Sequence, residues 1–455
     1  MTSAEPSSFG HPLAVVRHSY GWSYQGLVDA IARQAAKMPR IGNMAARREK
    51  AWRWEHWGVV PDRATQLALA AVLQVPEERL DRMGWPQWLP AGDTVRADFP
   101  WTADGCRTAL ADALERAMLD RRGFMVLSGG VLTGLADQWL SVSPDKIDAA
   151  LGGRARVDAD VVGWIEDRIP MLRKMDDQLG GAQLRQVVDA ELRLVNGLLG
   201  DGAYNTTVGS RLYAAAADLG QLAGWVSFDA GLHSAAQRYY VAALHAAQAA
   251  GNPVLGANVL AGMSYQATTA GEVTDAIALS ERACEGARRV ASPRVAAMLA
   301  ARQARAYALA GDRKSCLAAI GRAGEALARC DEHIEEPLWI YYFDEAELAA
   351  QAGACQLVLG QYEAANTEIA DALRMQNPTF ARDRTIYHLR LASTQLKLGD
   401  LEYAYSLGMD ACALARMNSS HRIATEMSIF RGQLQGWRQN PLAKELDEEL
   451  QQYAA

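Results

Sequence analysis

The amino-acid sequence predicts an all-α protein, and two observations carry that prediction. Apolar residues in the first part of the chain fall into helix-like segments instead of strands. From about residue 206 the chain is helical in character and repeats a pattern centred on glycine. Half of the 455 residues are hydrophobic, which is enough to bury a large core.

The net charge of −7 is divided unevenly along the chain. Residues 1–63 hold nine Lys and Arg residues against five Asp and Glu residues, a charge of +4, which leaves −11 for the rest. A basic end on an acidic body indicates contact with nucleic acid at that end only.

Four short helices are predicted at the start of the chain. They cover residues 11–20, 23–37, 44–56 and 62–73. Ser23 is placed to cap the second helix, in which Leu27, Ile31 and Ala35 share one face. Gly58 ends the third helix.

Several short sequences in this region form a set. They are Ser23-Tyr24-Gln25, Trp54-Glu55, Val60-Pro61-Asp62, Gln66-Leu67-Ala68-Leu69-Ala70 and Leu73-Gln74-Val75-Pro76. Together they resemble the helix-turn-helix domain of the Cro/repressor-like (XRE) regulators. The resemblance implies a phosphate or base contact for Gln25 and a structural role for Glu55. The chain departs from the family by a longer loop, residues 37–43, before Met44.

This loop and the helix after it hold most of the basic charge. Residues 33–53 contain seven Lys and Arg residues and one acidic residue, Glu49, which gives a local charge of +6. A recognition helix exposes donors near its N-terminus to reach base edges, which is where Arg47, Arg48 and Lys50 fall. Arg40 and Arg53 are predicted to contact phosphates. The alternative is a basic surface that is merely solvated.

The aromatic and proline-rich residues 85–92 mark the first domain boundary. We therefore expect a helix-turn-helix domain over residues 1–90. Residues 91–205 are expected to be a helical linker. Their amphipathic segment 184–199 can serve either dimerisation or packing against the next domain. The repeats cover residues 206–455.

The repeats are aligned on turn glycines that are spaced 40, 40, 49 and 39 residues apart. These glycines are Gly231, Gly271, Gly311, Gly360 and Gly399. Each has a small residue seven positions before it and small residues five and twelve positions after it. For Gly231 these are Gly224, Ala236 and Ala243. The pattern looks like tetratricopeptide repeats, although an armadillo-like repeat also fits the period. Residues 422–453 are expected to form a capping helix with a charged outer face.

A tetratricopeptide superhelix has a concave face lined by the first helix of each repeat. That register places amides, aromatic rings and charges on the concave face, namely Asp218, Gln221, Trp225, Phe228, Asn258, Tyr265, Arg305 and Glu347. Such a set suits a peptide backbone or a small ligand that is partly polar and partly apolar. The alternative is that some of these residues are core residues.

Other classes of protein are disfavoured. The chain has no HExxH, GxSxG or phosphate-loop motif and no cluster of Cys and His ligands, so no enzyme, metal site or cofactor is expected. The six cysteines lie far apart and are predicted to be core side chains. We expect a cytoplasmic protein, because no secretory signal or membrane-length apolar run is found.

The combination of domains resembles actinobacterial XRE-type regulators with a tetratricopeptide sensor and, more distantly, bacterial quorum-sensing peptide receptors. The resemblance implies a homodimeric, sequence-specific transcriptional regulator of double-stranded DNA. Its repeat domain would sense a peptide or small molecule, in a family linked to development and secondary metabolism. The alternative is a tetratricopeptide interaction adaptor whose N-terminal domain is vestigial or binds protein.

Overall fold

The computed structural model divides the chain into two compact units, residues 1–94 and 95–455. The structure describes residues 13, 16, 17, 22–42, 44–57, 59–73, 75, 77, 80, 85, 86, 88, 89, 95–116, 132, 135–137, 139, 155–179, 181–289, 292–331, 333–416 and 420–453. No helix among the described residues is long and apolar enough to cross a membrane.

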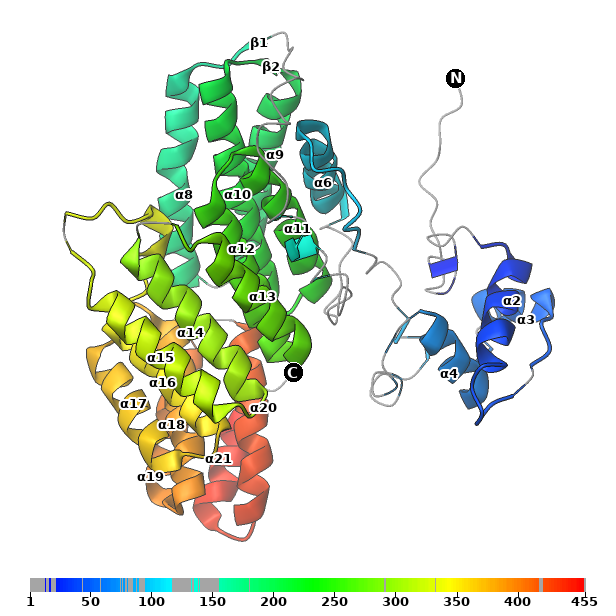
Figure 1. The fold of residues 1–455 in the computed structure, drawn as a ribbon. Helices are drawn as coiled ribbons and strands as arrows, with labels where there is room; N and C mark the ends of the chain where they lie inside the picture. Colours follow the sequence, from blue (N-terminus) through cyan, green and yellow to red (C-terminus); the bar gives the residue numbers. More distant parts are fainter. Residues whose placement is uncertain are drawn as a thin grey trace. The chain divides into compact units, whose positions relative to one another are not determined.

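The first unit is a small helical domain (Figure 1). Its helices are α2 (Tyr24–Ala35), α3 (Arg48–His56) and α4 (Arg63–Val72), and α2 packs on both others. Ser23 caps α2 by accepting a hydrogen bond from the backbone N–H of Gly26 at 3.1 Å. Asp62 caps α4 in the same way through the N–H of Thr65. These caps satisfy backbone donors that the first turn of a helix leaves free.

The helix expected from Met44 begins four residues later, at Arg48. Residues 44–47 are not helical, and their exposure alternates, with Met44 and Ala46 half-buried against the core of the unit. Packing two alternate side chains requires an extended backbone, because in a helix they would point about 200° apart. Tertiary contacts therefore delay the start of α3.

A buried ion pair fastens α3 to the segment before α2. Arg17 donates to both carboxylate oxygens of Glu55, at 2.7 and 3.1 Å, and both side chains are almost fully buried. Trp54 packs in the core beside Ala51, as the helical spacing predicts. Glu55 thus has a structural role in this unit.

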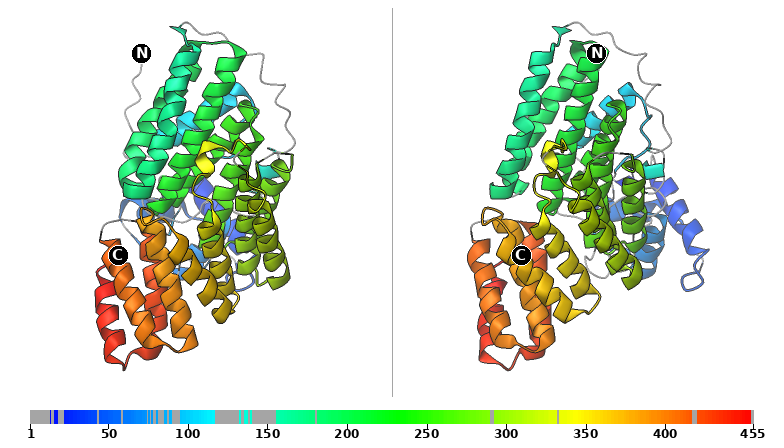
Figure 2. Two further views of the ribbon diagram at one scale, coloured as in Figure 1. Left: turned by 90° about the vertical axis from the view of Figure 1, so that its left-hand side faces the viewer. Right: turned by 60° about the vertical axis from the view of Figure 1, so that its left-hand side comes forward.

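The second unit begins with long helices that pack directly on the repeats. They are α6 (Ala103–Arg116), α8 (Ala159–Leu179) and α9 (Gly181–Asp201). Figures 1 and 2 show α8, α9 and the first repeat helix side by side, and one apolar core runs from Val95 through Phe343. A parallel pair of two-residue strands, β1 (Ala155–Arg156) and β2 (Gly202–Ala203), joins the ends of α8 and α9. The expected linker is thus part of the same compact unit as the repeats.

Five helical hairpins follow, and each turns at a glycine that the sequence predicts. The hairpins pair α10 (Thr206–Asp229) with α11 (His233–Ala249), α12 (Pro253–Ala270) with α13 (Val273–Gly286), α14 (Pro293–Leu309) with α15 (Arg313–Leu327), α16 (Glu345–Val358) with α17 (Tyr362–Met375), and α18 (Ala381–Leu398) with α19 (Leu401–Ala415). All five turn glycines have φ between 71° and 90°. That left-handed conformation is costly for a residue with a Cβ atom. The all-α repeat architecture is therefore confirmed.

Small residues let the paired helices approach. A Cβ atom on Gly224 would overlap the ring of Tyr240 in the partner helix. Ser264 donates to the backbone carbonyl of Ala276 at 2.8 Å across the second hairpin. The wider 49-residue spacing has a structural cause, because residues 328–344 form a long connection that contains the 3-10 helix η3 (Leu338–Ile340).

The C-terminal cap consists of two helices instead of the single one expected. They are α20 (His421–Leu434) and α21 (Pro441–Gln451), separated by the 3-10 turn η4 (Gln435–Trp437). Pro441 cannot donate a backbone hydrogen bond, so it begins a new helix instead of continuing the old one. Helix α21 buries Leu446 and Leu450 and exposes charged residues such as Lys444 and Glu448.

Candidate functional site

The first candidate site is the basic surface at the start of α3. Arg47 is the N-terminal cap residue, and Arg48 and Lys50 lie in the first turn. Arg47 and Arg48 are exposed, and Lys50 is half-buried. Within the described residues Arg48 has one ion pair, at 3.4 Å to its exposed neighbour Glu49, and Arg47 and Lys50 have none. These cations are available to an external anion.

The other predicted DNA contacts differ in their surroundings. Arg40 is exposed in the loop before α3, and Arg53 is exposed with its guanidinium 5.7 Å from the ring centre of Trp57. Gln25 already uses its side-chain amide, which donates to Asp29 at 2.8 Å and to the carbonyl of Ala46 at 3.3 Å. Gln25 therefore holds the extended segment before α3 against α2.

An exposed aromatic cluster on α3 was not predicted. Trp52 stacks on His56 with ring centres 4.7 Å apart and meets Trp57 edge-on at 5.2 Å. Trp57 is 66% exposed, and Val60 beyond the helix is 61% exposed. The signal in the sequence was the position of these two residues: Trp52 lies two residues before the buried Trp54, and Trp57 lies three residues after it.

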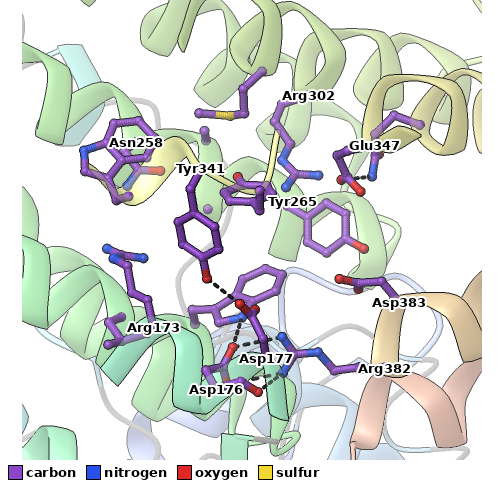
Figure 3. A pocket seen from close by; sticks show the side chains of 18 of the residues that line it. Arg173, Asp176, Asp177, Asn258, Tyr265, Arg302, Tyr341, Glu347, Arg382 and Asp383 are labelled. Carbon is purple, nitrogen blue, oxygen red and sulfur yellow. Dashed lines mark hydrogen bonds and ion pairs between the residues drawn. The ribbon is translucent and has the colours of Figure 1, made fainter. Parts of the chain in front are cut away.

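The second candidate site is a pocket inside the repeat unit (Figure 3). The first helix of every hairpin contributes to it, together with α8, α20 and the connection that holds η3. The space between the lining atoms is about 890 Å³, part of it open to solvent. Its charged and aromatic lining residues are Arg173, Asp176, Asp177, Trp225, Tyr265, Arg302, Trp339, Tyr341, Tyr342, Glu347, Arg382, Asp383, Tyr387, Arg390 and Arg422.

Long-range ion pairs close the superhelix around this pocket. Arg382 of α18 donates to Asp176 of α8 at 2.8 Å and to Asp229 of α10 at 3.3 Å, and all three side chains are buried. Ser420, which precedes α20, donates to Asp229 at 2.7 Å. The end of the repeat series is thereby fastened to its beginning, consistent with the contact between α18 and α8 (Figure 2).

The structure brings five predicted groove residues together. Gln221, Trp225, Asn258, Tyr265 and Glu347 all line the pocket. They come from α10, α12 and α16, as the repeat register implies.

Three predicted groove residues lie elsewhere. Asp218 is behind the lining, where it pairs with Arg173. Phe228 is only 1% exposed, because its ring packs against Trp225 and Tyr265 in the core. Arg305, one turn beyond Arg302 on α14, is not among the lining residues.

Most of the charged lining was missed by sequence reasoning. The arginines of α18 and α20 lie in the fifth hairpin and in the C-terminal cap, for which no groove residue was proposed. Tyr341 and Tyr342 come from the long connection, whose one signal was the 49-residue spacing. The acidic residues Asp176 and Asp177 come from α8, outside the repeats altogether.

The basic side of the pocket surrounds Tyr265. Its hydroxyl lies 3.1 Å from the guanidinium of Arg422, and the guanidinium of Arg302 lies 4.5 Å from its ring centre. Burial alone would raise the pKa of Tyr265, but the guanidinium groups of Arg422, Arg390 and Arg302 outweigh burial and lower the pKa to about 8. The positive potential here is therefore strong.

The acidic side of the pocket lies at the end of α8. Asp177 accepts a hydrogen bond from Tyr341, which reaches into the pocket from the long connection (Figure 3). Burial raises the pKa of Asp177 to about 7, and the carboxylate of Asp176 adds to the rise. Across the pocket, burial also raises the pKa of Glu347, which accepts hydrogen bonds from Tyr387 and Gln351.

The pocket presents charged, aromatic and amide side chains to a ligand. Its charges are held by hydrogen bonds from several helices, and aromatic rings line it beside amides. Among the residues that the structure describes, no group of three or more His, Cys, Asp or Glu side chains is arranged for a metal ion.

These features define an all-α helical-repeat protein with a separate small helical unit and a charged central pocket. No protein-family model matches the chain, and no curated protein matches it. Among solved structures it is similar to the apo form of the quorum sensor NprR from B. thuringiensis. The identity is 12% and the TM-score 0.35, over 77% of this chain and 98% of that one. A likeness at this level leaves the function to be inferred from the two sites themselves.

Proposed function

We propose that this protein is a bacterial, cytoplasmic, sequence-specific DNA-binding transcriptional regulator whose repeat unit senses a small signal molecule or peptide. The observation that carries the proposal is the set of exposed cations at the start of α3, in a compact unit distinct from the one that holds the acidic repeats. The chain has no catalytic role in this proposal.

The basic surface is suited to DNA in its geometry and in its support. Arg47 and Arg48 project from the N-terminal end of a helix, the part that reaches base edges in helix-turn-helix domains. The buried Arg17–Glu55 pair holds the other end of α3 against the domain core. A fixed helix limits the conformational entropy that binding must offset.

The sensing role is supported by where the pocket residues come from. A ligand in the pocket would contact α8, the long connection and α18 at once, although these segments are far apart in sequence. A ligand can shift an equilibrium only if it prefers one arrangement of the protein. Contacts to segments this remote provide such a preference, because they are all formed only when the superhelix is closed.

Self-association is supported by one face of α9. Val187, Ala190 and Leu194 are all exposed and lie three and four residues apart, so they form one apolar stripe. The neighbouring α8 exposes Trp164, at 72%, and Met171, at 64%. Apolar side chains gathered this way are typical of interfaces, and a second copy of the chain would place two α3 helices on one palindromic operator.

The test is capture of sheared genomic DNA by the full-length protein, read by sequencing. A triple variant, Arg47→Ala, Arg48→Ala and Lys50→Ala, is compared with a control of equal charge loss, Arg313→Ala, Lys314→Ala and Arg329→Ala. The control residues are exposed and lie in the repeat unit. We expect wild type and control to enrich a palindromic site and the α3 variant to enrich none. Equal enrichment by the α3 variant would refute the assignment.

One observation favours a second candidate function. The exposed Trp52–His56–Trp57 cluster could seat a protein partner, and the chain would then be an interaction adaptor. Salt separates the two functions, because a tenfold rise in salt lowers the logarithm of DNA affinity by about 0.9 for each phosphate that is neutralised. Absence of any DNA binding, with partner capture lost in Trp57→Ala, would favour the adaptor.

A further inference from the structure

Three charged side chains of the pocket, Arg302, Asp177 and Glu347, have no ion pair within 4.0 Å among the described residues, although the charges of Arg302 and Glu347 interact at longer range. Arg302 of α14 is 7% exposed, and no carboxylate of a described residue lies within 4.0 Å of it. Asp177 of α8 accepts a hydrogen bond from Tyr341, but no cationic nitrogen of a described residue lies within 4.0 Å. Figure 3 shows both side chains directed into the same cavity from different sides.

The other arginines of the pocket differ in this respect. Arg173 pairs with Asp218, and Arg390 donates to Glu426 at 2.9 Å. Those charges are already balanced within the protein, as are Arg382 and Asp176.

The charge of Arg422 is neutralised by carboxylates that lie farther away. It lies 3.6 Å from Asp383 and 3.8 Å from Asp229, and its Nη1 atom is buried without a hydrogen-bond acceptor. Arg302 is therefore the lining arginine with no ion pair among the described residues, and it shares the Tyr265 ring with Arg422.

An unpaired buried charge is costly, so its presence in a cavity needs a physical reason. The arginine and the aspartate do not pair with each other, which leaves each able to meet an opposite charge from outside. A molecule with an anionic group at one end and an amino group at the other would satisfy both.

We propose that the pocket binds a small zwitterion, whose carboxylate or phosphate pairs with Arg302 and Arg422 beside Tyr265 and whose ammonium group pairs with Asp177. This inference rests on the proposed function, because it states the chemical class of the signal. Amide and aromatic side chains of the same lining, Asn258 and Trp225, suit a short polar and apolar body. Free amino acids, short peptides and amino-phosphates share this chemistry.

The test measures the thermal stability of the full-length chain without DNA, at fixed ionic strength. The probes are the free amino acids, a pool of dipeptides and tripeptides, and phosphoethanolamine. Each peptide pool is also supplied with its C-terminus amidated or its N-terminus acetylated, which removes one charge at a time. The variants are Arg302→Gln and Asp177→Asn, with Arg438→Gln and Glu448→Gln as exposed controls.

We expect at least one free zwitterion class to raise the Tm of wild type and of both controls. The responding class identifies the source of the ligand. When peptides respond, the amidated and acetylated pools should bind at least about tenfold more weakly. Arg302→Gln should be indifferent to amidation and Asp177→Asn to acetylation. Without a probe, both variants should have a Tm close to that of wild type, because neither substitution breaks an ion pair within 4.0 Å among the described residues.

Two results would overturn the proposal. One is a Tm gain that is the same for free and blocked probes or for wild type and Arg302→Gln. The other is the absence of a gain with every probe. Because DNA is not present, neither result bears on the outcome of the DNA-capture experiment.

Discussion

The arginines of the two units have opposite surroundings. In the N-terminal unit Arg40, Arg47, Arg48 and Arg53 are exposed and make few contacts. In the repeat unit the pocket arginines are buried, and all but Arg302 are paired with carboxylates from other helices. The same side chain thus provides a surface for an external polyanion in one unit and fixes a tertiary arrangement in the other.

The difference follows from the dielectric surroundings of each group. An exposed guanidinium is solvated and costs nothing to leave unpaired, so it can exchange water for phosphate. A buried guanidinium must be paired, and each pair joins two segments whose positions it then determines. Among the described residues of the first unit, Arg17 is the arginine that is buried in an ion pair as the pocket arginines are.

The largest expected effect comes from breaking the ion pairs that close the superhelix. Arg382→Met would leave Asp176 and Asp229 buried without their main partner, at a cost of about 3–5 kcal/mol in the free energy of unfolding. Urea unfolding followed by circular dichroism measures this cost. Arg438→Gln is the control, since Arg438 is exposed. A loss below about 1 kcal/mol would show that the closure is not held by this charge.

The corresponding change in the first unit is Arg17→Met, which leaves the carboxylate of Glu55 buried in the core without this ion pair. We expect a loss of about 3 kcal/mol, confined to the unfolding of residues 1–94. Because α3 would lose its anchor, DNA binding should fall while the response of the pocket to its ligand is unchanged. Hydrogen exchange resolved by segment distinguishes the two units. Loss of protection in α10–α19 would contradict the separation of the two units.

Removing one exposed arginine should have a smaller effect, which is on DNA affinity, and it should have no effect on stability. Arg48→Ala is expected to weaken specific DNA binding by about 1–3 kcal/mol, the value of a good contact to a base. Its Tm should equal that of wild type, because Arg48 is exposed and its one ion pair with a described residue is with its exposed neighbour Glu49. Fluorescence anisotropy at two salt concentrations provides the measurement. A fall in Tm would place Arg48 among the structural arginines.

The smallest effect concerns pH. Burial raises the pKa of Asp177 to about 7 from 3.8, so the folded chain binds more protons than the unfolded chain between these values. The contribution of this group to stability is therefore present at about pH 4 and is lost as pH rises to about 7. Asp177→Asn should flatten that decline in a Tm-against-pH profile, and Glu448→Gln should not. An unchanged profile in Asp177→Asn would show that Asp177 is solvated.

Local features were predictable where a residue type is strongly favoured in one backbone conformation or position. The five turn glycines were found from sequence because each must adopt a positive φ between helices. Ser23 caps its helix as predicted, because its side chain can reach the backbone N–H of Gly26. Five of the eight proposed groove residues line the pocket, because the repeat register determines which face of each first helix turns inward.

The start of α3 was not predictable in the same way. Residues 44–47 have the composition of a helix, and their packing against the core draws them into an extended backbone. The surroundings of Arg302 were also hidden, since the absence of an ion pair with any described residue shows only when its neighbours are in place.

The sequence by itself determined the all-α class, the repeat register, the turn glycines and the division of charge between a basic start and an acidic remainder. These depend on the chemistry of single residues and on spacings within about one hairpin. Only the tertiary structure decided that the superhelix closes, because Arg382 meets Asp176 across 206 residues of chain. It alone decided which buried charges are paired and which face an open cavity, since pairing depends on distances between helices that no local pattern contains.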